Sequence, residues 1–193
     1  MVQFASEPAP HTRQARLIIL DRDGVINHDS DQYIRTPEEW RPIPGSLEAI
    51  ARLNHAGFRV VVATNQSGLG RGLYDTATMI AINEKMHKAL AQVGGRIDAV
   101  FFCPHTAEAD CDCRKPKAGM LFEIGRRFGV ELTGVPSIGD SLRDLQAAEA
   151  VGAQPILVLT GKGEKTLREG RFPANTVIFP DLAFAVTALL AGD

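Results

Sequence analysis

The sequence predicts an α/β protein built on a doubly wound, mainly parallel sheet. Short apolar runs alternate with amphipathic stretches along most of the chain, which is typical of βαβ units. The run Leu-Ile-Ile-Leu at 17–20 is apolar at every position, as expected for a strand buried on both faces. Because no repeat or linker divides the chain, we expect one domain at 16–193 after a polar lead-in, residues 1–15.

The expected elements follow in order from this pattern. Ser46 is expected to cap the first helix, which Gly57 closes, and Asp75 or Thr76 is expected to begin the second helix. The expected strands are 17–20, 59–63, 97–102, 135–138, 156–159 and 177–179. The expected helices are 46–57, 76–93, 118–128, 142–151 and 182–190.

Composition excludes several classes of function. The chain has 193 residues and a formal net charge of −2, which gives no reason to expect a nucleic-acid partner. No stretch approaches the roughly 20 apolar residues that a membrane-spanning helix needs, and the N-terminus lacks the apolar core of a signal peptide. We therefore expect a monomer in the cytoplasm that acts on a small molecule.

Polar residues follow the expected strands at the points where the strands end. Ligands of a doubly wound sheet bind beyond the carboxyl ends of its strands, so these residues are expected to share one edge. They are Asp21 and Asp23 after the first strand, Thr64 and Asn65 after the second, Lys115 after the third, and Asp140 after the fourth. A single Asp-x-Asp or Gly-Asp is common in turns and caps, whereas this ordered set is difficult to obtain by chance.

The set predicts a phosphatase that works through a covalent aspartyl-phosphate. Asp21 is the predicted nucleophile, and Asp23 is the predicted general acid and base. Attack on an anionic phosphate needs positive charge, which we expect from Mg²⁺ near Asp140 and from the ammonium of Lys115. Thr64 and the backbone amide after it are expected to donate hydrogen bonds to the phosphoryl oxygens.

The cysteines point to a second metal site. Three cysteines and one histidine fall within eleven positions: Cys103, His105, Cys111 and Cys113. Three sulfurs and one imidazole are the ligands of a closed tetrahedral zinc site, which is structural because it leaves no position for an activated water. Since the loop leads directly into Arg114 and Lys115, we expect the zinc to hold these two cations in place.

The ordered set resembles the four motifs of the haloacid dehalogenase (HAD) superfamily of phosphatases: Asp21-Arg22-Asp23-Gly24, Thr64-Asn65, Lys115-Pro116 and Gly139-Asp140. The resemblance extends over nearly the whole chain from Leu17. It implies a Rossmann-like fold and Mg²⁺ held by Asp21, the backbone carbonyl of Asp23, and Asp140. Asp144, one helical turn on, is expected to support Asp140. The gaps between the motifs are too short for a cap domain, so a capless, open site is expected.

Within this superfamily the zinc loop resembles two branches, one acting on a heptose bisphosphate and one on histidinol phosphate. The segment 64–72, Thr-Asn-Gln-Ser-Gly-Leu-Gly-Arg-Gly, resembles the heptose branch. The resemblance implies hydrolysis of the C7 phosphate of a heptose 1,7-bisphosphate, a precursor of lipopolysaccharide core. One departure from that branch is Ser141, which stands where a lysine is frequent, and Arg143 is a candidate substitute.

A bisphosphate needs cations at both ends of its site. Arg114 and Arg71 are expected to bind the far phosphate. The full set of predicted substrate contacts is Asp29, Ser30, Tyr33, Asn65, Gln66, Ser67, Arg71 and Arg114. The segment 161–163, Gly-Lys-Gly, lacks the spacing and Ser/Thr of a P-loop. A distant alternative is a phospho-receiver, although receivers carry the phosphorylated Asp later in the chain and need no second Asp.

Overall fold

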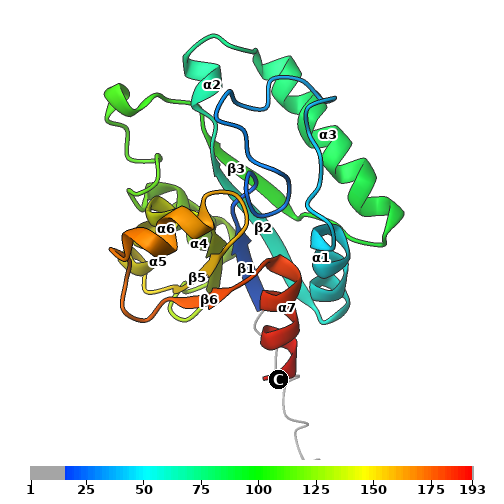
Figure 1. The fold of residues 1–193 in the computed structure, drawn as a ribbon, viewed down its shortest axis with the longest axis vertical. Helices are drawn as coiled ribbons and strands as arrows, with labels where there is room; N and C mark the ends of the chain where they lie inside the picture. Colours follow the sequence, from blue (N-terminus) through cyan, green and yellow to red (C-terminus); the bar gives the residue numbers. More distant parts are fainter. Residues whose placement is uncertain (1–15, 193) are drawn as a thin grey trace, which may run out of the picture.

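A single sheet organises the fold of residues 16–192, which are the residues that the computed structural model describes. All six strands of this sheet run parallel, in the order β3-β2-β1-β4-β5-β6 (Figure 1). The strands are β1 (Arg16–Leu20), β2 (Phe58–Asn65), β3 (Ala99–Cys103), β4 (Pro136–Gly139), β5 (Gln154–Val158) and β6 (Val177–Phe179). The predicted doubly wound α/β fold is confirmed, and the predicted lead-in, 1–15, lies outside the described residues.

Helices cover both faces of the sheet (Figure 1). The helices are α1 (Ser46–His55), α2 (Ser67–Gly70), α3 (Thr76–Gln92), α4 (Gly119–Phe128), α5 (Leu142–Ala150), α6 (Gly163–Glu169) and α7 (Leu182–Ala191), with a 3₁₀ turn, η1, at Ala107–Ala109. One face carries α1, α3 and α7, and the opposite face carries α4 and α5. No helix in this part of the chain combines the length and apolar character needed to cross a bilayer.

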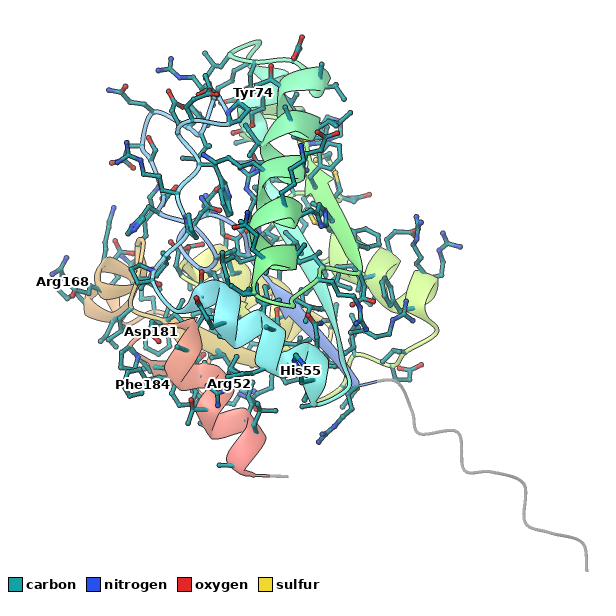
Figure 2. The ribbon with its side chains drawn as sticks, turned by 90° about the vertical axis from the view of Figure 1, so that its right-hand side faces the viewer. Arg52, His55, Tyr74, Arg168, Asp181 and Phe184 are labelled. Carbon is teal, nitrogen blue, oxygen red and sulfur yellow. The ribbon has the colours of Figure 1, made fainter. Side chains whose placement is uncertain are left out.

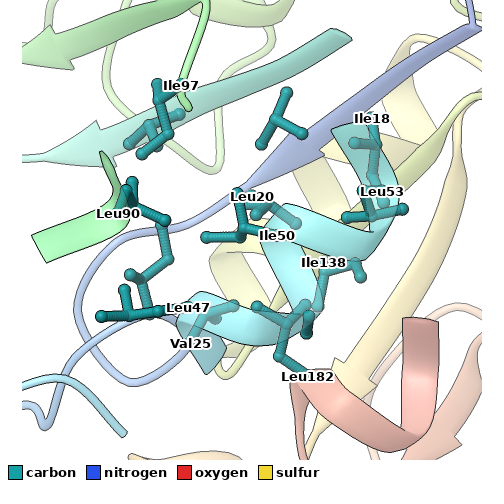
Figure 3. Close-up of a cluster of buried hydrophobic side chains, with 14 of the residues drawn as sticks. Ile18, Leu20, Val25, Leu47, Ile50, Leu53, Leu90, Ile97, Ile138 and Leu182 are labelled. Atoms are coloured by element: carbon teal, nitrogen blue, oxygen red, sulfur yellow. The ribbon is translucent and has the colours of Figure 1, made fainter. Parts of the chain in front are cut away.

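The strand β1 is buried on both faces because its side chains alternate between two cores. Ile18 and Leu20 pack with α1 and α3, whereas Leu17 and Ile19 pack with α4. Figure 3 shows the first of these cores, where Leu53 of α1 lies over the strands. The continuous apolar run recognised in the sequence therefore follows from the central place of β1 in the sheet.

The last helix closes the first core against α1. Figure 2 shows α7 beside α1, where the Arg52 guanidinium of α1 donates to the hydroxyl of Thr187 of α7. Leu182 and Val186 are buried, whereas Phe184 is exposed on the outer side of the helix. Asp181 caps α7 by accepting a hydrogen bond from the backbone of Phe184, as Asp residues commonly do.

Several boundaries differ from the sequence-based expectations. Ser46 does not cap α1: Gly45 occupies the cap, and the hydroxyl of Ser46 donates to the carbonyl of Ile26 at 2.7 Å. The strand β2 includes Thr64 and Asn65, because pairing with β3 continues to that point. The short elements α2, η1 and α6 were not predicted, since four- and seven-residue helices carry little periodicity.

The order of the strands places the site. Connections from β1 proceed toward β2 and β3 on one side and return to β4 on the other, so the topological switch point lies between β1 and β4. Asp21 follows β1, and Asp140 follows β4. Within residues 16–192, the polar segment 21–45 and the loops at this edge stand in place of a cap domain.

Candidate active site

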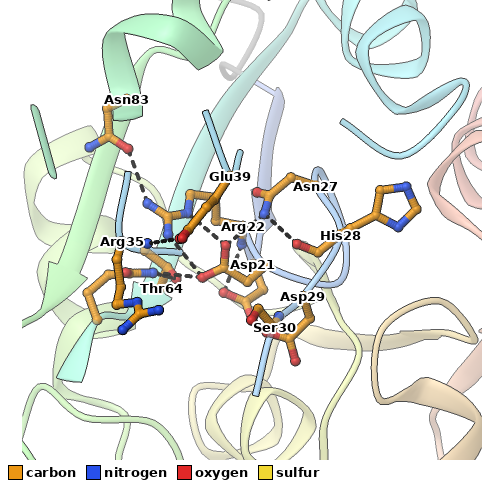
Figure 4. A network of polar contacts seen from close by, with 12 residues as sticks. Asp21, Arg22, Asn27, His28, Asp29, Ser30, Arg35, Glu39, Thr64 and Asn83 are labelled. Carbon is orange, nitrogen blue, oxygen red and sulfur yellow. Dashed lines mark hydrogen bonds and ion pairs between the residues drawn. The ribbon is translucent and has the colours of Figure 1, made fainter. Parts of the chain in front are cut away.

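A polar cleft of about 190 Å³ opens at the carboxyl edge of the sheet. It is lined by Asp21, Asp23, Asp29, Ser30, Asp31, Tyr33, Ile34, Thr64, Asn65, Gln66, Ser67, Arg71, Arg114, Arg143 and Lys162. Figure 4 shows Asp21, Asp29 and Thr64 gathered in this region. The structure therefore brings every predicted substrate contact to the cleft, while Lys115 and Asp140 lie buried beneath it.

Three buried carboxylates form the floor of the cleft. Carboxylate oxygens of Asp21, Asp140 and Asp144 lie within 4.8 Å of one another, and each residue is at most 5% exposed. Gly24 permits this approach: it adopts φ +84°, and a Cβ there would collide with the carboxylate of Asp140. The close packing explains why glycine follows the Asp-x-Asp pair.

The electrostatics of this floor fit a divalent cation. Burial, and then the charges of Asp144 and Asp21, raise the pKa of Asp140 to about 8. Burial likewise raises the pKa of Asp21 to about 6, although Lys115 opposes the shift. One oxygen of Asp140, Oδ1, is buried without a hydrogen-bond partner. Oxygen ligands with excess negative charge are those that Mg²⁺ prefers.

Lys115 is held between Asp21 and the helix α5. Its Nζ lies 3.2 Å from Oδ1 of Asp21 and 2.6 Å from Oδ1 of Asp144, and it donates to the carbonyl of Ala63 at 2.6 Å. Asp144 therefore supports Lys115, and it also accepts hydrogen bonds from the backbone and hydroxyl of Ser141. The carboxylate of Asp144 also lies within 4.8 Å of that of Asp140, so the support of Asp140 by Asp144 stays a prediction.

Asp23 is fixed by a buried arginine that sequence analysis did not single out. Arg22 is 1% exposed, and its Nε and Nη2 each donate to an oxygen of Asp23 at 3.0 Å. Asn27 and Gln66 donate to the same carboxylate at 2.8 and 2.9 Å. Burial alone would raise the pKa of Asp23, but these donors hold it below its usual range. Figure 4 shows Arg22 reaching on toward Asn83 of α3.

Asn65 and Gln66 make hydrogen bonds within the protein that could not be predicted from the sequence. The Gln66 amide donates to Thr64 Oγ1 at 3.0 Å and accepts from the Tyr74 hydroxyl at 2.7 Å. The Asn65 side chain clamps the backbone of Lys115, donating to its carbonyl and accepting from its amide. The side chains of Gln66 and Asn65 thus make their hydrogen bonds within the protein. The Thr64 hydroxyl accepts from Gln66, so its own proton can be donated to a phosphoryl oxygen.

Three arginines contribute positive charge to the lining of the cleft. Arg71 and Arg114 line it, and Arg114 is oriented by a hydrogen bond from Nη1 to the carbonyl of His105 at 3.2 Å. Arg143 also faces the cleft, and the charges of Asp144 and Asp21 outweigh its burial and raise its pKa. Arg143 thus brings positive charge to the carboxylate floor in a chain that has Ser141 in place of a lysine.

The predicted zinc ligands converge at one point beside the cleft. The Sγ atoms of Cys103, Cys111 and Cys113 and the Nδ1 of His105 are separated by 3.4 to 3.6 Å along the four contacts between them. Tetrahedral zinc with sulfur ligands at about 2.3 Å separates its ligand atoms by about 3.7 Å, so the cluster fits this metal. Burial raises the pKa of Cys103 to about 12, which a metal ion would reverse.

Comparisons with known proteins place the chain among phosphatases. Residues 112–185 match the HAD-hydrolase-like family model, and residues 16–137 match the polynucleotide kinase 3 phosphatase model. A D-glycero-beta-D-manno-heptose-1,7-bisphosphate 7-phosphatase of Bordetella bronchiseptica is 58% identical over 91% of this chain and 98% of its own length. The protein with the same name in Pseudomonas aeruginosa is 55% identical over 90% and 97%.

Solved structures agree with these relatives. The D,D-heptose 1,7-bisphosphate phosphatase of B. bronchiseptica, complexed with magnesium and phosphate, has a TM-score of 0.91 and 57% identity over 92% of this chain and 99% of its own. The corresponding enzyme of Burkholderia thailandensis has a TM-score of 0.73 and 50% identity over 91% and 99%. These similarities favour the heptose branch over the histidinol phosphate branch.

Proposed function

Because this chain belongs to the HAD-like hydrolases, and within them to the family of D-glycero-beta-D-manno-heptose-1,7-bisphosphate 7-phosphatases, we propose that it hydrolyses the C7 phosphate of that sugar. The observation that carries the proposal is the convergence of Asp21, Lys115 and Asp140 beneath one polar cleft. We propose the β configuration at C1 of the sugar substrate because the names of the relatives specify it.

In the first half-reaction, a carboxylate oxygen of Asp21 attacks phosphorus and the bond from phosphorus to the C7 oxygen breaks. Lys115 and the hydroxyl of Thr64 balance the charge of the phosphoryl group. Asp23 protonates the leaving oxygen. Arg22 keeps Asp23 ionised in the free enzyme. Asp23 therefore takes up a proton from the solvent as the anionic phosphate approaches, because a nearby anion raises a carboxyl pKa.

In the second half-reaction, Asp23 removes a proton from water, whose oxygen attacks the phosphorus of the aspartyl-phosphate. The bond from phosphorus to the Asp21 oxygen breaks, and inorganic phosphate and the free carboxylate are formed. Asp23 is poised for this role because Arg22, Asn27 and Gln66 hold it in its ionised form.

Mg²⁺ is the metal we assign to the carboxylate floor. Asp21, Asp140 and the backbone carbonyl of Asp23 would hold it, in agreement with the unpaired Oδ1 of Asp140. When bound, Mg²⁺ lowers the electrostatic cost of bringing an anionic phosphate against a carboxylate.

The remainder of the cleft suits a phosphorylated sugar. Arg114 and Arg71 would bind the far phosphate, and Asp29, Ser30 and Tyr33 would contact hydroxyls of the sugar. Gln66 and Asn65 act on the substrate indirectly, through Asp23 and Lys115, and Ser67 lines the cleft beside them. We also propose that the enzyme is a monomer, since the mechanism above uses no residue of a second chain. Cysteines gathered at a candidate metal site, and not paired in disulfides, support a reducing cytoplasm.

Parallel turnover of two substrates tests the proposed function. The purified protein should hydrolyse the heptose 1,7-bisphosphate at C7 with a higher kcat/KM than histidinol phosphate. Activity should disappear with EDTA and return with Mg²⁺, because the carboxylate floor lacks sufficient positive charge of its own. Faster hydrolysis of histidinol phosphate, or release of the C1 phosphate, would contradict the proposal.

Zinc is proposed as the structural metal of the cysteine loop, and His105→Asn tests this assignment. We expect the variant to lose its zinc and to lose kcat by about ten- to a hundredfold, because Arg114 and Lys115 follow the loop directly. The matched control is His87→Asn on the exposed side of α3, which should retain both zinc and activity. Full zinc content in the His105 variant would overturn the ligand assignment.

A further inference from the structure

The loop between β5 and α6 is anchored to the catalytic floor although it carries no assigned role. The hydroxyl of Thr160 donates to the carbonyl of Gly24 at 2.6 Å, and the backbone amide of Lys162 donates to Oδ2 of Asp140 at 2.8 Å. Gly161 has φ +57°, and a Cβ there would collide with Asp140. The base of the Lys162 side chain is therefore fixed relative to the site.

The side chain of Lys162 crosses from this loop to the segment that faces the substrate. Its Nζ lies 3.2 Å from Oδ2 of Asp29 and 3.3 Å from Oδ1 of Asp31. Asp31 is 91% exposed, whereas Asp29 is 21% exposed, so water screens the pair with Asp29 less. The other oxygen of Asp29 accepts from the amide of Ser30 at 2.8 Å, so both oxygens of this carboxylate are oriented.

We propose that Lys162 is a positioning residue for sugar recognition, which ties the segment 29–31 to the loop that holds Asp140. The inference deepens the proposed function and rests on it, since Asp29 is assigned there to the sugar. A direct role as phosphate ligand is less suited to Lys162, because two carboxylates already neutralise its ammonium. In the part of the chain that the structure describes, Arg71 and Arg114 form no comparable pair within ion-pair distance.

Lys162→Met removes the charge and retains most of the length of the side chain. We expect KM for the heptose bisphosphate to rise about fivefold with kcat nearly unchanged, as for the loss of one partly shielded ion pair. The concentration of Mg²⁺ for half-maximal activity should stay the same, because the backbone donor to Asp140 remains. Turnover of 4-nitrophenyl phosphate, which has no sugar hydroxyls, should also be unaffected.

Three further variants separate positioning from other roles. Lys162→Arg should have a KM close to that of the wild type, since it retains the ion pair. Lys165→Met, in the adjoining helix α6 and 72% exposed, is the matched control and should behave like the wild type. The double variant Lys162→Met/Asp29→Asn should have the KM of Asp29→Asn alone, because the lysine acts through that carboxylate.

The inference is overturned if the two substitutions raise KM independently, which would indicate direct contact with the substrate. It is also overturned if Lys162→Met changes nothing, or if it lowers kcat on both substrates together with Mg²⁺ affinity. A wild type that shows no preference for the heptose bisphosphate would contradict the proposed function itself, and Lys162 would then have no sugar contact to position.

Discussion

Asp21→Asn should reduce turnover of the heptose bisphosphate by about 10⁴-fold or more, because an amide cannot form the covalent phosphoryl intermediate. Intact-protein mass spectrometry of the quenched variant should show no phosphoryl adduct after mixing with substrate. Substrate should still bind, since Arg114 and Arg71 at the other end of the cleft are unchanged.

The Tm of Asp21→Asn shows whether its loss of activity comes from the missing nucleophile or from unfolding. Burial is the largest cause of the raised pKa of Asp21, so a neutral amide removes a poorly solvated charge. Lys115 keeps its ion pair with Asp144, at 2.6 Å, in this variant. We therefore expect that the Tm does not fall. Asp181→Asn is the control: it makes the same chemical change at the cap of α7, where Asn caps equally well, and should leave activity intact. A phosphoryl adduct on the Asp21 variant would place the nucleophile elsewhere.

Asp23→Asn should give a different kinetic result. The nucleophile and Lys115 remain, and the leaving group of 4-nitrophenyl phosphate departs without an added proton, so one phosphoryl group from this substrate should accumulate on Asp21. Steady-state turnover of the heptose bisphosphate should fall by about 10²- to 10⁴-fold, because both the acid and the base are missing. Rapid quenching followed by mass spectrometry and peptide mapping would show the adduct and its position. A non-enzymatic receiver would be little affected by this substitution, so unchanged behaviour would contradict the phosphatase mechanism.

The same substitution should also destabilise the fold, in contrast to Asp21→Asn. Arg22 is 1% exposed, and its fork to Asp23 supplies its one ion pair within residues 16–192. Removing the charge of a partner from a buried pair costs about 3 kcal/mol, although the amide oxygen retains part of the hydrogen bonding. Chemical unfolding of the two variants against the wild type measures this difference. Equal stability of both variants would show that Arg22 does not depend on the charge of Asp23.

Much of the fold could be predicted because its signals are local. The run at 17–20 predicts a strand buried on both faces, and β1 lies at the centre of the sheet. The helix α3 begins at Thr76 with Asp75 as its cap, within the expected start at Asp75 or Thr76. Ser46 illustrates the limit: its sequence context suits a cap, but its hydroxyl bonds to Ile26, twenty positions earlier, and Gly45 takes the cap.

In the candidate site, too, some features could be predicted from local sequence signals, whereas others depend on contacts between distant segments. Asp21 and Asp140 directly follow strands, and Lys115 ends the loop after β3. Their order along the chain therefore predicted that these proposed catalytic residues would lie together at one edge of the sheet. The convergence of the proposed zinc ligands could also be predicted, because they lie within eleven positions of one another. Residue type and spacing along the chain were enough for these predictions.

Only the tertiary structure decided which groups hold the catalytic residues in place. Arg22 holds Asp23, Asn65 clamps Lys115, and Lys162 reaches Asp29 from a loop more than a hundred residues later in the sequence. These contacts depend on how the loops of different strands pack at one edge of the sheet, and a lysine or glutamine in a loop carries no signal of its partner. The Asp-x-Asp pair thus reveals the chemistry, while its neighbours in space set its charge and orientation.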